Sequence, residues 1–400
     1  MDNLAAVEEQ TRRIGTELFT QVKEESVRFF RSEQWTARLL EWAMRHEAMK
    51  VKLFRFVDVL PTLGEDTQVV RHLEEYFGGG PDPFRGLLKM GLSLAGAGRW
   101  GARAAAATLR KGVEQVARSF IAGTTIDEIV TVVEEFYRQG QGTTIDVLGE
   151  ATLSEAEADA YQQRYLDLLS VLIERSAHWP VVAQVEEAPW GRLPRINLSV
   201  KLSAFYSQLD PIDPEQGTSR VMERLSPLLQ KARAHNVHIQ IDMEDYHLKD
   251  LTLHLLRHIG ESPPFRDYRH LGVALQAYLR ESEIDAQELI AWARRRGTPI
   301  TVRLVKGAYW DFEVVHARLE GWPVPVYEQK WETDASFERL TRLFLENHDC
   351  IDLAIGSHNI RSIAHALALV QALDLPPRSV EFQVLYGMAA PLRRALSKRG

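Results

Sequence analysis

The 400-residue chain has a single cysteine, Cys350, and no long uninterrupted run of apolar residues. One cysteine excludes an intrachain disulfide framework and any metal site built from several thiolates, and it is typical of a reducing cytoplasm. The small-residue stretch 91–109 is interrupted by Arg99 and Arg103, which argues against a membrane-spanning helix. The amino-terminal residues have neither the basic start nor the apolar centre of a secretory signal, so we expect a cytoplasmic protein.

An excess of positive charge and the common hydrolase motifs are also missing. The formal net charge is −7, so composition gives no reason to expect a nucleic-acid surface. The sequence has no Gly-x-Ser-x-Gly elbow and no phosphate-binding Walker loop. The pairs His235/His238 and His254/His258 have no carboxylate or cysteine set to complete a metal site, and we interpret them as surface or structural residues. What is present is 45% hydrophobic residues, enough for a large core.

The first third of the chain has the pattern of an all-helical region. From residue 5 to about residue 138, apolar residues recur at helical spacing, as at Leu18, Val22 and Phe29. The segment Gly-Gly-Gly-Pro-Asp-Pro at 78–83 cannot continue a helix and is expected to be a loop. We therefore predict a helical arm and linker region over residues 1–138.

From residue 139 onward, short strand-like runs alternate with longer amphipathic helical ones. Strands are expected at residues 143–148, 196–202, 237–242, 272–277, 300–305, 353–357 and 380–385. Helices between them are expected at residues 154–176, 219–234, 285–295, 336–345 and 361–373. This alternation predicts a parallel sheet covered by helices, that is, an α/β protein.

Polar or charged residues stand at the carboxyl ends of nearly all the expected strands. They are Glu150, Lys201, Asp242, Gln276, Arg303, Lys306, His358, Asn359 and Gln383. In a (β/α)₈ barrel these ends converge on one face, which holds the active site. A doubly wound sheet is disfavoured because no glycine-rich dinucleotide turn follows the first strand. We predict a TIM-like (β/α)₈ barrel over residues 139–400.

The run at residues 300–310 carries the densest chemistry. Arg303 and Lys306 are either paired structurally or face an anionic ligand, because unpaired charges are costly near a buried strand. The guanidinium of Arg303 presents several hydrogen-bond donors in a fixed plane, which suits pyrophosphate oxygens or an electron-rich ring edge. Gly307 allows close approach of a backbone, while Tyr309 and Trp310 offer flat surfaces for a ring or simply belong to the core.

Two further strand ends allow more than one interpretation. Lys201 is either an ion-pair partner at the barrel mouth or an anchor for a substrate carboxylate. Asp242 is a possible partner of Lys201 or Arg303, and a buried ion pair is its simplest role. His358 and Asn359 are suited to hydrogen bonds with phosphate or ribose, or they are structural.

Four ordered segments closely resemble the proline dehydrogenase family, in particular its members within proline utilisation A proteins. They are Arg-Leu-Val-Lys-Gly-Ala-Tyr-Trp at 303–310, Lys-Leu-Ser-Ala at 201–204, Ile-Asp-Met-Glu at 241–244 and Glu-Phe-Gln-Val-Leu-Tyr-Gly-Met at 381–388. The resemblance runs from residue 143 to the end, and the helical opening resembles the arm and linker before the family's barrel. No ribbon-helix-helix module precedes the barrel, so no gene-repressor role is expected.

The resemblance implies a distorted barrel that holds FAD noncovalently and oxidises L-proline to Δ1-pyrroline-5-carboxylate by hydride transfer to the flavin. A quinone is the implied electron acceptor, which would bring the cytoplasmic protein to the membrane surface during turnover. The implied cofactor contacts are Gln276, Arg303, Val305, Lys306, Gly307, Ala308, Tyr309, Trp310, Thr333, His358 and Asn359. The implied catalytic residues are Lys201, Asp242 and Arg303, and the implied substrate contacts are Lys201, Leu304 and Leu385.

The sequence departs from the family at its carboxyl end. Family members carry a tyrosine on an eighth strand and a Tyr-Leu-x-Arg-Arg motif on a final helix, whereas this sequence stops at Gly400. The barrel is therefore expected to be incomplete at its carboxyl end, lacking the final strand and helix. Arg393 and Arg394, in a short helix expected at 390–396, do not replace that motif and are expected on a solvated face. We therefore expect a piece of a longer polypeptide, with an aldehyde dehydrogenase domain following. The alternatives are a catalytically incomplete fragment that retains only cofactor or partner binding, and a flavin dehydrogenase for hydroxyproline.

Overall fold

The computed structural model describes residues 2–32, 59–77, 120–149 and 151–399, with isolated helical positions at 52, 55, 56, 103, 107 and 111. The chain divides into two compact units, within residues 1–23, 123–384 and 389–400 for the first and residues 24–122 and 385–388 for the second. The second unit contains the 3₁₀ helix η1 (Leu60–Thr62) and the helix α4 (Asp66–Phe77). Phe56 and Tyr76 form an edge-to-face aromatic pair there, with ring centroids 6.2 Å apart. The loop expected at 78–83 and most of the stretch 91–109 lie outside the described residues.

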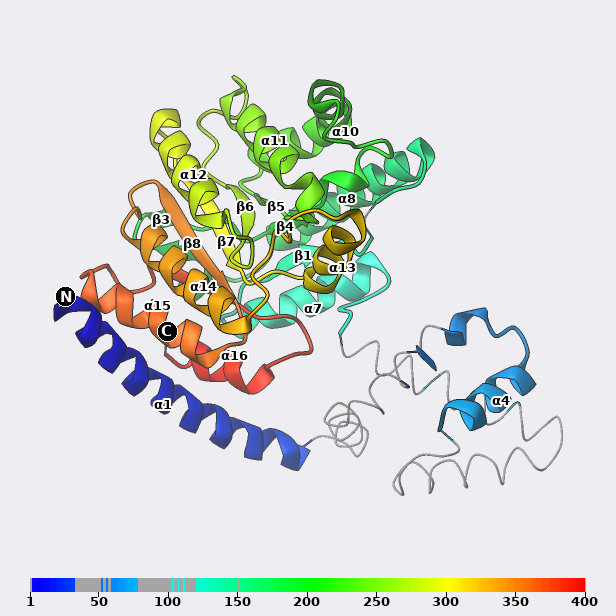
Figure 1. The fold of residues 1–400 in the computed structure, drawn as a ribbon, viewed down its shortest axis with the longest axis horizontal. Helices are drawn as coiled ribbons and strands as arrows, with labels where there is room; N and C mark the ends of the chain where they lie inside the picture. Colours follow the sequence, from blue (N-terminus) through cyan, green and yellow to red (C-terminus); the bar gives the residue numbers. More distant parts are fainter. Residues whose placement is uncertain are drawn as a thin grey trace. The chain divides into compact units, whose positions relative to one another are not determined.

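The first unit is built on one parallel sheet of seven strands, which curls into a half-barrel (Figure 1). The strands are β1 (Thr144–Asp146), β4 (Asn197–Val200), β5 (His238–Ile241), β6 (Leu271–Gln276), β7 (Ile300–Val305), β8 (Ile351–Gly356) and β9 (Val380–Gln383). Their order in the sheet is β1-β4-β5-β6-β7-β8-β9, so strands that follow one another along the chain lie side by side. All seven predicted strands are present, and the predicted TIM-like α/β architecture is confirmed.

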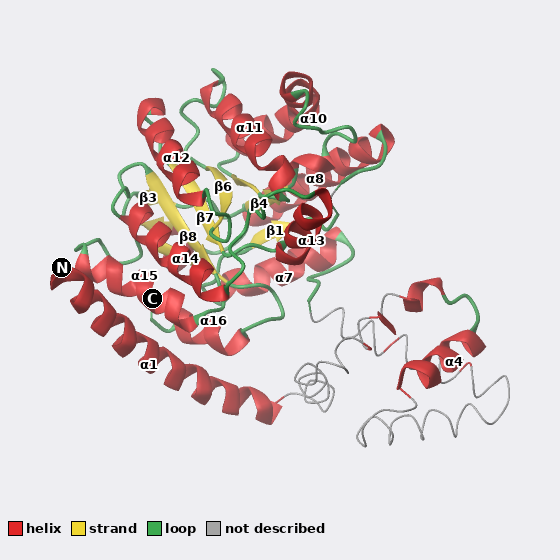
Figure 2. Cartoon of the chain, viewed as in Figure 1, coloured by secondary structure: helices red, strands yellow, loops and turns green. Residues whose placement is uncertain are grey.

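Helices cover the convex side of the sheet (Figure 2). In chain order the helices around the sheet are α7 (Ile126–Arg138), α8 (Glu155–Ser176), α10 (Pro214–Ala234), α11 (Lys249–Glu261), α12 (Ser282–Arg296), α14 (Lys330–Leu345), α15 (Ile360–Ala372) and α16 (Ala390–Ser397). Helix α13 (Trp310–Glu320) instead belongs to a small separate cluster, in which its Val314 joins Tyr278 and Leu279 from the loop after β6. Their ends follow local chemistry: Thr125 and Glu128 form a capping box at α7, and Gly297 and Gly321 end α12 and α13 in left-handed conformations. No helix among the described residues is long and apolar enough to cross a membrane.

The first 23 residues belong to the barrel unit. They form most of helix α1 (Asp2–Ser32), which lies along α15 and α16 (Figure 1). Its buried Ile14 and Leu18 join the barrel's hydrophobic cluster. An ion pair of 2.9 Å joins Glu8 to Arg361 on α15. The helical opening is therefore divided between the two units.

Helix α16 is packed more tightly than a solvated face would be. Leu392 and Ala395 are buried, and the guanidinium of Arg393 lies 4.3 Å from the ring centroid of Phe136 on α7. Arg393 and Arg394 are both half-buried. The expectation of a solvated arginine pair is wrong, because both arginines are half-buried and the Arg393 guanidinium lies against an aromatic ring.

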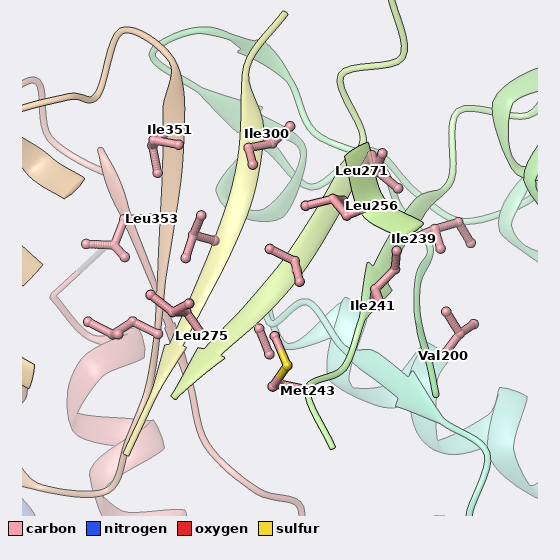
Figure 3. Packing of buried hydrophobic residues seen from close by; sticks show 14 of the residues in the cluster. Val200, Ile239, Ile241, Met243, Leu256, Leu271, Leu275, Ile300, Ile351 and Leu353 are labelled. Carbon is pink, nitrogen blue, oxygen red and sulfur yellow. The ribbon is translucent and has the colours of Figure 1, made fainter. Parts of the chain in front are cut away.

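The sheet separates apolar from polar side chains by strand alternation. Figure 3 shows part of the apolar layer, with Val200, Ile239, Ile241, Leu275 and Ile300 among the labelled residues. The pairing register places the alternate residues on the opposite, concave face, because neighbours in a parallel ladder share a face. That face carries Asp146, Ser199, Lys201, Gln240, Asp242, Gly272, Ala274, Gln276, Arg303, Val305, Ala354 and Gly356. Chemistry is thereby confined to the inside and most of the packing to the outside.

Candidate active site

A charged cluster of five residues lies on the concave face: Asp146 on β1, Ser199 on β4, Lys201 just after β4, Asp242 just after β5 and Arg303 on β7. Nη1 of Arg303 is 2.5 Å from Oδ1 of Asp242 and donates a second hydrogen bond, of 3.2 Å, to the Ser199 hydroxyl. That hydroxyl in turn donates to Oδ1 of Asp242 at 2.7 Å. Nζ of Lys201 is 2.8 Å from Oδ2 of Asp146 and 3.8 Å from Oδ2 of Asp242. The structure brings the three predicted catalytic residues together, and Asp242 faces both cations.

Burial raises the pKa of two groups here, Asp146 within the cluster and Tyr165 beside it. Burial raises the pKa of Asp146, and the hydrogen bond and charge of Lys201 oppose this shift. Burial, together with the charges of Asp146 and Asp242, raises the pKa of Tyr165 on α8 well above its ordinary value. Tyr165 therefore stays a neutral phenol and donates to the backbone carbonyl of Ser199 at 3.0 Å.

Several polar atoms of this face are buried without a hydrogen-bond partner among the described residues. They include Nε and Nη2 of Arg303 and Oε1 of Gln276. Such atoms cost about 1–3 kcal/mol each when nothing satisfies them. Two donors and one acceptor are therefore available to a polar ligand on the concave face.

The amide of Gln276 is held in one orientation by its other end. Its Nε2 donates to the backbone carbonyl of Glu244 at 2.9 Å, which leaves Oε1 as the free acceptor. The Glu244 carboxylate is buried, accepts from the backbone N–H of Ser203 at 3.1 Å and also accepts from the Ser203 hydroxyl. The loops after β4 and β5 thus fix a side chain at the end of β6.

The segment that follows β7 is anchored in a fixed conformation. Lys306 forms an ion pair with Asp334 on α14. Gly307 has φ +131°, and a Cβ there would lie 2.4 Å from the ring of Tyr278. Trp310 donates from Nε1 to the carbonyl of Tyr327 at 2.9 Å and remains 40% exposed. Glycine is therefore required at 307 by both conformation and space.

The other predicted contacts take varied positions. Thr333 is buried on α14, directly before Asp334. His358 and Asn359 follow β8, where burial lowers the pKa of His358 and the Asn359 side chain caps α15 by accepting from the N–H of Ser362. Val305 lies on the concave face in register with Gln276 and Gly356, and Ala308 and Tyr309 lie in the turn before α13.

One predicted substrate contact, Leu304, is not brought to the charged cluster. Leu304 is fully buried in the hydrophobic cluster and alternates with Arg303, so its side chain lies on the helix-facing side of β7. Leu385 belongs to the second unit, and the residue is 66% exposed. Their roles at a substrate remain predictions.

Sequence reasoning missed Ser199 and Asp146 as members of the cluster, and it treated His238 only as a surface or structural residue. His238 is buried on the concave face, and burial lowers its pKa to about 3. The signal was strict alternation: Asn-Leu-Ser-Val-Lys at 197–201 and His-Ile-Gln-Ile-Asp at 238–242 put every second residue on one face. Strands of a barrel with an apolar interior would instead be hydrophobic on both faces.

A parallel half-barrel with charged residues at the carboxyl ends of its strands defines the catalytic domain of a (β/α) barrel enzyme. The described residues contain no group of three metal-ligating side chains. Residues 129–400 match the family model described as proline dehydrogenase, and residues 8–120 match the model described as the proline utilization A N-terminal domain. The chain belongs to the proline dehydrogenase family.

Named relatives agree with this assignment. The chain is 30% identical over 292 residues to the bifunctional protein PutA of Escherichia coli, covering 71% of this chain and 21% of that protein. It is 28% identical over 289 residues to proline dehydrogenase 1 of Bacillus subtilis, covering 72% of this chain and 80% of that protein. The chain therefore spans about a fifth of the PutA protein it matches.

Solved structures give the same fold. Proline utilization A from Bdellovibrio bacteriovorus, inactivated by N-propargylglycine, superposes with a TM-score of 0.83 at 35% identity over 96% of this chain and 39% of that one. The Bradyrhizobium japonicum protein superposes with a TM-score of 0.70 at 22% identity over 98% of this chain and 40% of that one, which shows the fold alone.

Proposed function

We propose that this chain forms the flavin-binding and proline-binding part of an FAD-dependent proline dehydrogenase, which oxidises L-proline to Δ1-pyrroline-5-carboxylate. Family membership supports the reaction class. The observation that carries the proposal is the set of buried, unpartnered polar atoms of Arg303 and Gln276 beside Lys201 and Asp242, as judged over the described residues.

The residues present fit a flavin. The edge of an isoalloxazine ring carries carbonyl and ring-nitrogen acceptors beside one N–H donor. Arg303 offers two free donors and Gln276 one free acceptor on the same face. Val305, Lys306, Gly307, Ala308, Tyr309 and Trp310 adjoin them along the chain, and Thr333, His358 and Asn359 are proposed to contact the more distant parts of FAD. When bound, the flavin supplies the hydride acceptor.

The charged cluster is suited to holding an amino acid. Oxidation removes a hydride from the carbon next to the proline nitrogen, and this is easiest when that nitrogen is neutral. We assign Lys201, which contacts both Asp146 and Asp242, as the anchor for the substrate carboxylate. Asp242 holds Arg303 and faces Lys201, so it keeps both cations in place.

The charges of the cluster also bear on turnover. Arg303 and Lys201 contribute +2, and Asp242 and Asp146 contribute −2 when ionised, so the cluster offers no net positive charge to a carboxylate. This balance is the observation behind a second candidate, in which the 400 residues bind flavin but oxidise proline poorly without further cations; proline oxidation remains the leading proposal. A quinone acceptor, a peripheral membrane location and a following aldehyde dehydrogenase domain remain predictions for the whole protein.

The test is flavin binding and anaerobic flavin reduction by the purified 400-residue protein. We expect bound FAD with visible flavin absorbance, and bleaching by L-proline faster than by hydroxyproline. Bound FAD that proline does not bleach would support the flavin-binding fragment. Lys201→Met should slow bleaching. Lys23→Met, at an exposed position of α1, is its control and should leave the rate unchanged. Failure to bind FAD, even when FAD is added, would refute the proposal.

A further inference from the structure

We propose that Ser199 is a positioning residue, whose hydroxyl fixes Arg303 against Asp242 and thereby aims the rest of the guanidinium at the flavin. The inference rests on the proposed function. It adds a residue that forms no part of the charged pairs themselves.

The contact between Arg303 and Asp242 uses only one atom from each group. Nη1 of Arg303 meets Oδ1 of Asp242 at 2.5 Å, so the pair lacks the two parallel hydrogen bonds of a forked arginine–carboxylate contact. A single contact leaves the guanidinium free to turn about it. The Ser199 hydroxyl removes this freedom, because it accepts from Nη1 at 3.2 Å and donates to Oδ1 at 2.7 Å.

Ser199 is itself held rigidly. It lies within β4, in register with Asp146 on β1 and Gln240 on β5, and is 1% exposed. Its backbone carbonyl accepts from the hydroxyl of Tyr165 on α8 at 3.0 Å. A residue whose backbone is held by strands on both sides and by a helix can keep the group that it contacts within a narrow range of positions.

The three-way contact uses Nη1 and leaves Nε and Nη2 of Arg303 buried and without partners among the described residues. These are the donors that we assign to the flavin. If Ser199 loses its hydroxyl, Arg303 keeps its charge and Asp242 keeps its cation, but the direction of the two donors is no longer set. The flavin's electronic environment should therefore change while the fold persists.

The experiment compares Ser199→Ala, Ser199→Thr and Ser199→Val in the FAD-loaded protein. Threonine and valine are nearly equal in volume and differ by the hydroxyl, so any packing effect is shared by both. We expect Ser199→Ala and Ser199→Val to shift the flavin absorbance spectrum and reduction potential. We expect both to slow proline bleaching about 10–100-fold, the range for losing one or two hydrogen bonds to charged groups. Ser199→Thr should restore the spectrum.

Ser379→Ala is the matched control. Ser379 is also buried, and its hydroxyl donates to the Pro376 carbonyl away from the charged cluster. It should leave the spectrum unchanged. The inference is overturned if Ser199→Ala keeps the wild-type spectrum and potential, or if Ser199→Thr and Ser199→Val behave alike. A wild-type protein without flavin refutes the proposed function instead, so the two failures are distinguishable.

Discussion

Replacing Gly307 by alanine tests whether the segment after β7 is fixed as the structure shows. Gly307 has φ +131°, a conformation that costs about 1–3 kcal/mol for a residue with a side chain. The added Cβ would also lie 2.4–2.5 Å from three ring atoms of Tyr278, closer than any real contact. Relieving such a clash in a packed region costs about 1–3 kcal/mol. Gly307→Ala should therefore lower the free energy of unfolding by about 2–6 kcal/mol.

Gly297→Ala is the control that separates the two contributions. Gly297 has φ +74°, and a Cβ there would meet none of the described heavy atoms within 4 Å. That variant should lose only the conformational part, about 1–2 kcal/mol. Equilibrium urea unfolding measures both values, with an unchanged dependence on urea showing that the change lies in stability.

A second background tests the clash itself. When Tyr278 is alanine, the cost of Gly307→Ala should fall to its conformational part, giving a coupling of about 1–3 kcal/mol between the two sites. The reasoning is refuted if Gly307→Ala costs no more than Gly297→Ala, or if removing the Tyr278 ring leaves its cost unchanged.

Three other features lead to tests. Glu244→Leu should lower the free energy of unfolding by about 1–3 kcal/mol and weaken FAD retention, because Ser203 loses its hydrogen-bond acceptor. Glu244→Gln keeps an acceptor and should lose less stability. Equal losses of stability in the two variants would contradict this. Burial raises the pKa of Asp352 to about 6 despite its ion pair with Arg269. The native state therefore binds more protons than the unfolded state between about pH 4 and 6, so this group makes stability fall as pH rises through that range. Urea unfolding at several pH values should show a flatter dependence of stability on pH in Asp352→Asn. An unchanged dependence would count against the role of Asp352. Lys249→Met removes a buried cation from three carboxylates and should cost about 3–5 kcal/mol in urea unfolding, whereas a loss under 1 kcal/mol would mean that the network is weak.

The elements of the barrel were predictable because their signals are local. The run at 300–305 has the length and β-branched content of a strand, and β7 occupies those residues. The helix expected at 154–176 became α8, which starts after the cap residue Ser154. Boundaries differed by a few residues where turns, rather than periodicity, end an element.

Pairings between distant residues were not predictable in the same way. Arg303 and Asp242 are 61 residues apart, and the sequence left open whether Asp242 pairs with Lys201 or with Arg303. The register of three strands decides this, because it brings Asp242 to both cations. The small hairpin of β2 (Glu187–Ala188) and β3 (Gly191–Arg192) also escaped prediction, because Glu186, which binds the Arg192 and Arg195 side chains, holds the base of the hairpin. Such contacts depend on the fold and leave no periodic signal.

The alternation of the strands has a consequence for how the sequence can change. Along a strand such as β7, residues 300, 302 and 304 face the helices and residues 301, 303 and 305 face inward. Neighbouring positions are therefore constrained differently, the first set by packing and the second by the chemistry of the concave face. If every position of a strand is substituted in turn, the loss of folded protein should be large and small at alternate positions along the strand. Losses of activity without loss of folded protein should occupy the alternate positions. Such a sheet can acquire new chemistry at inward positions while the outer ones continue to maintain the fold.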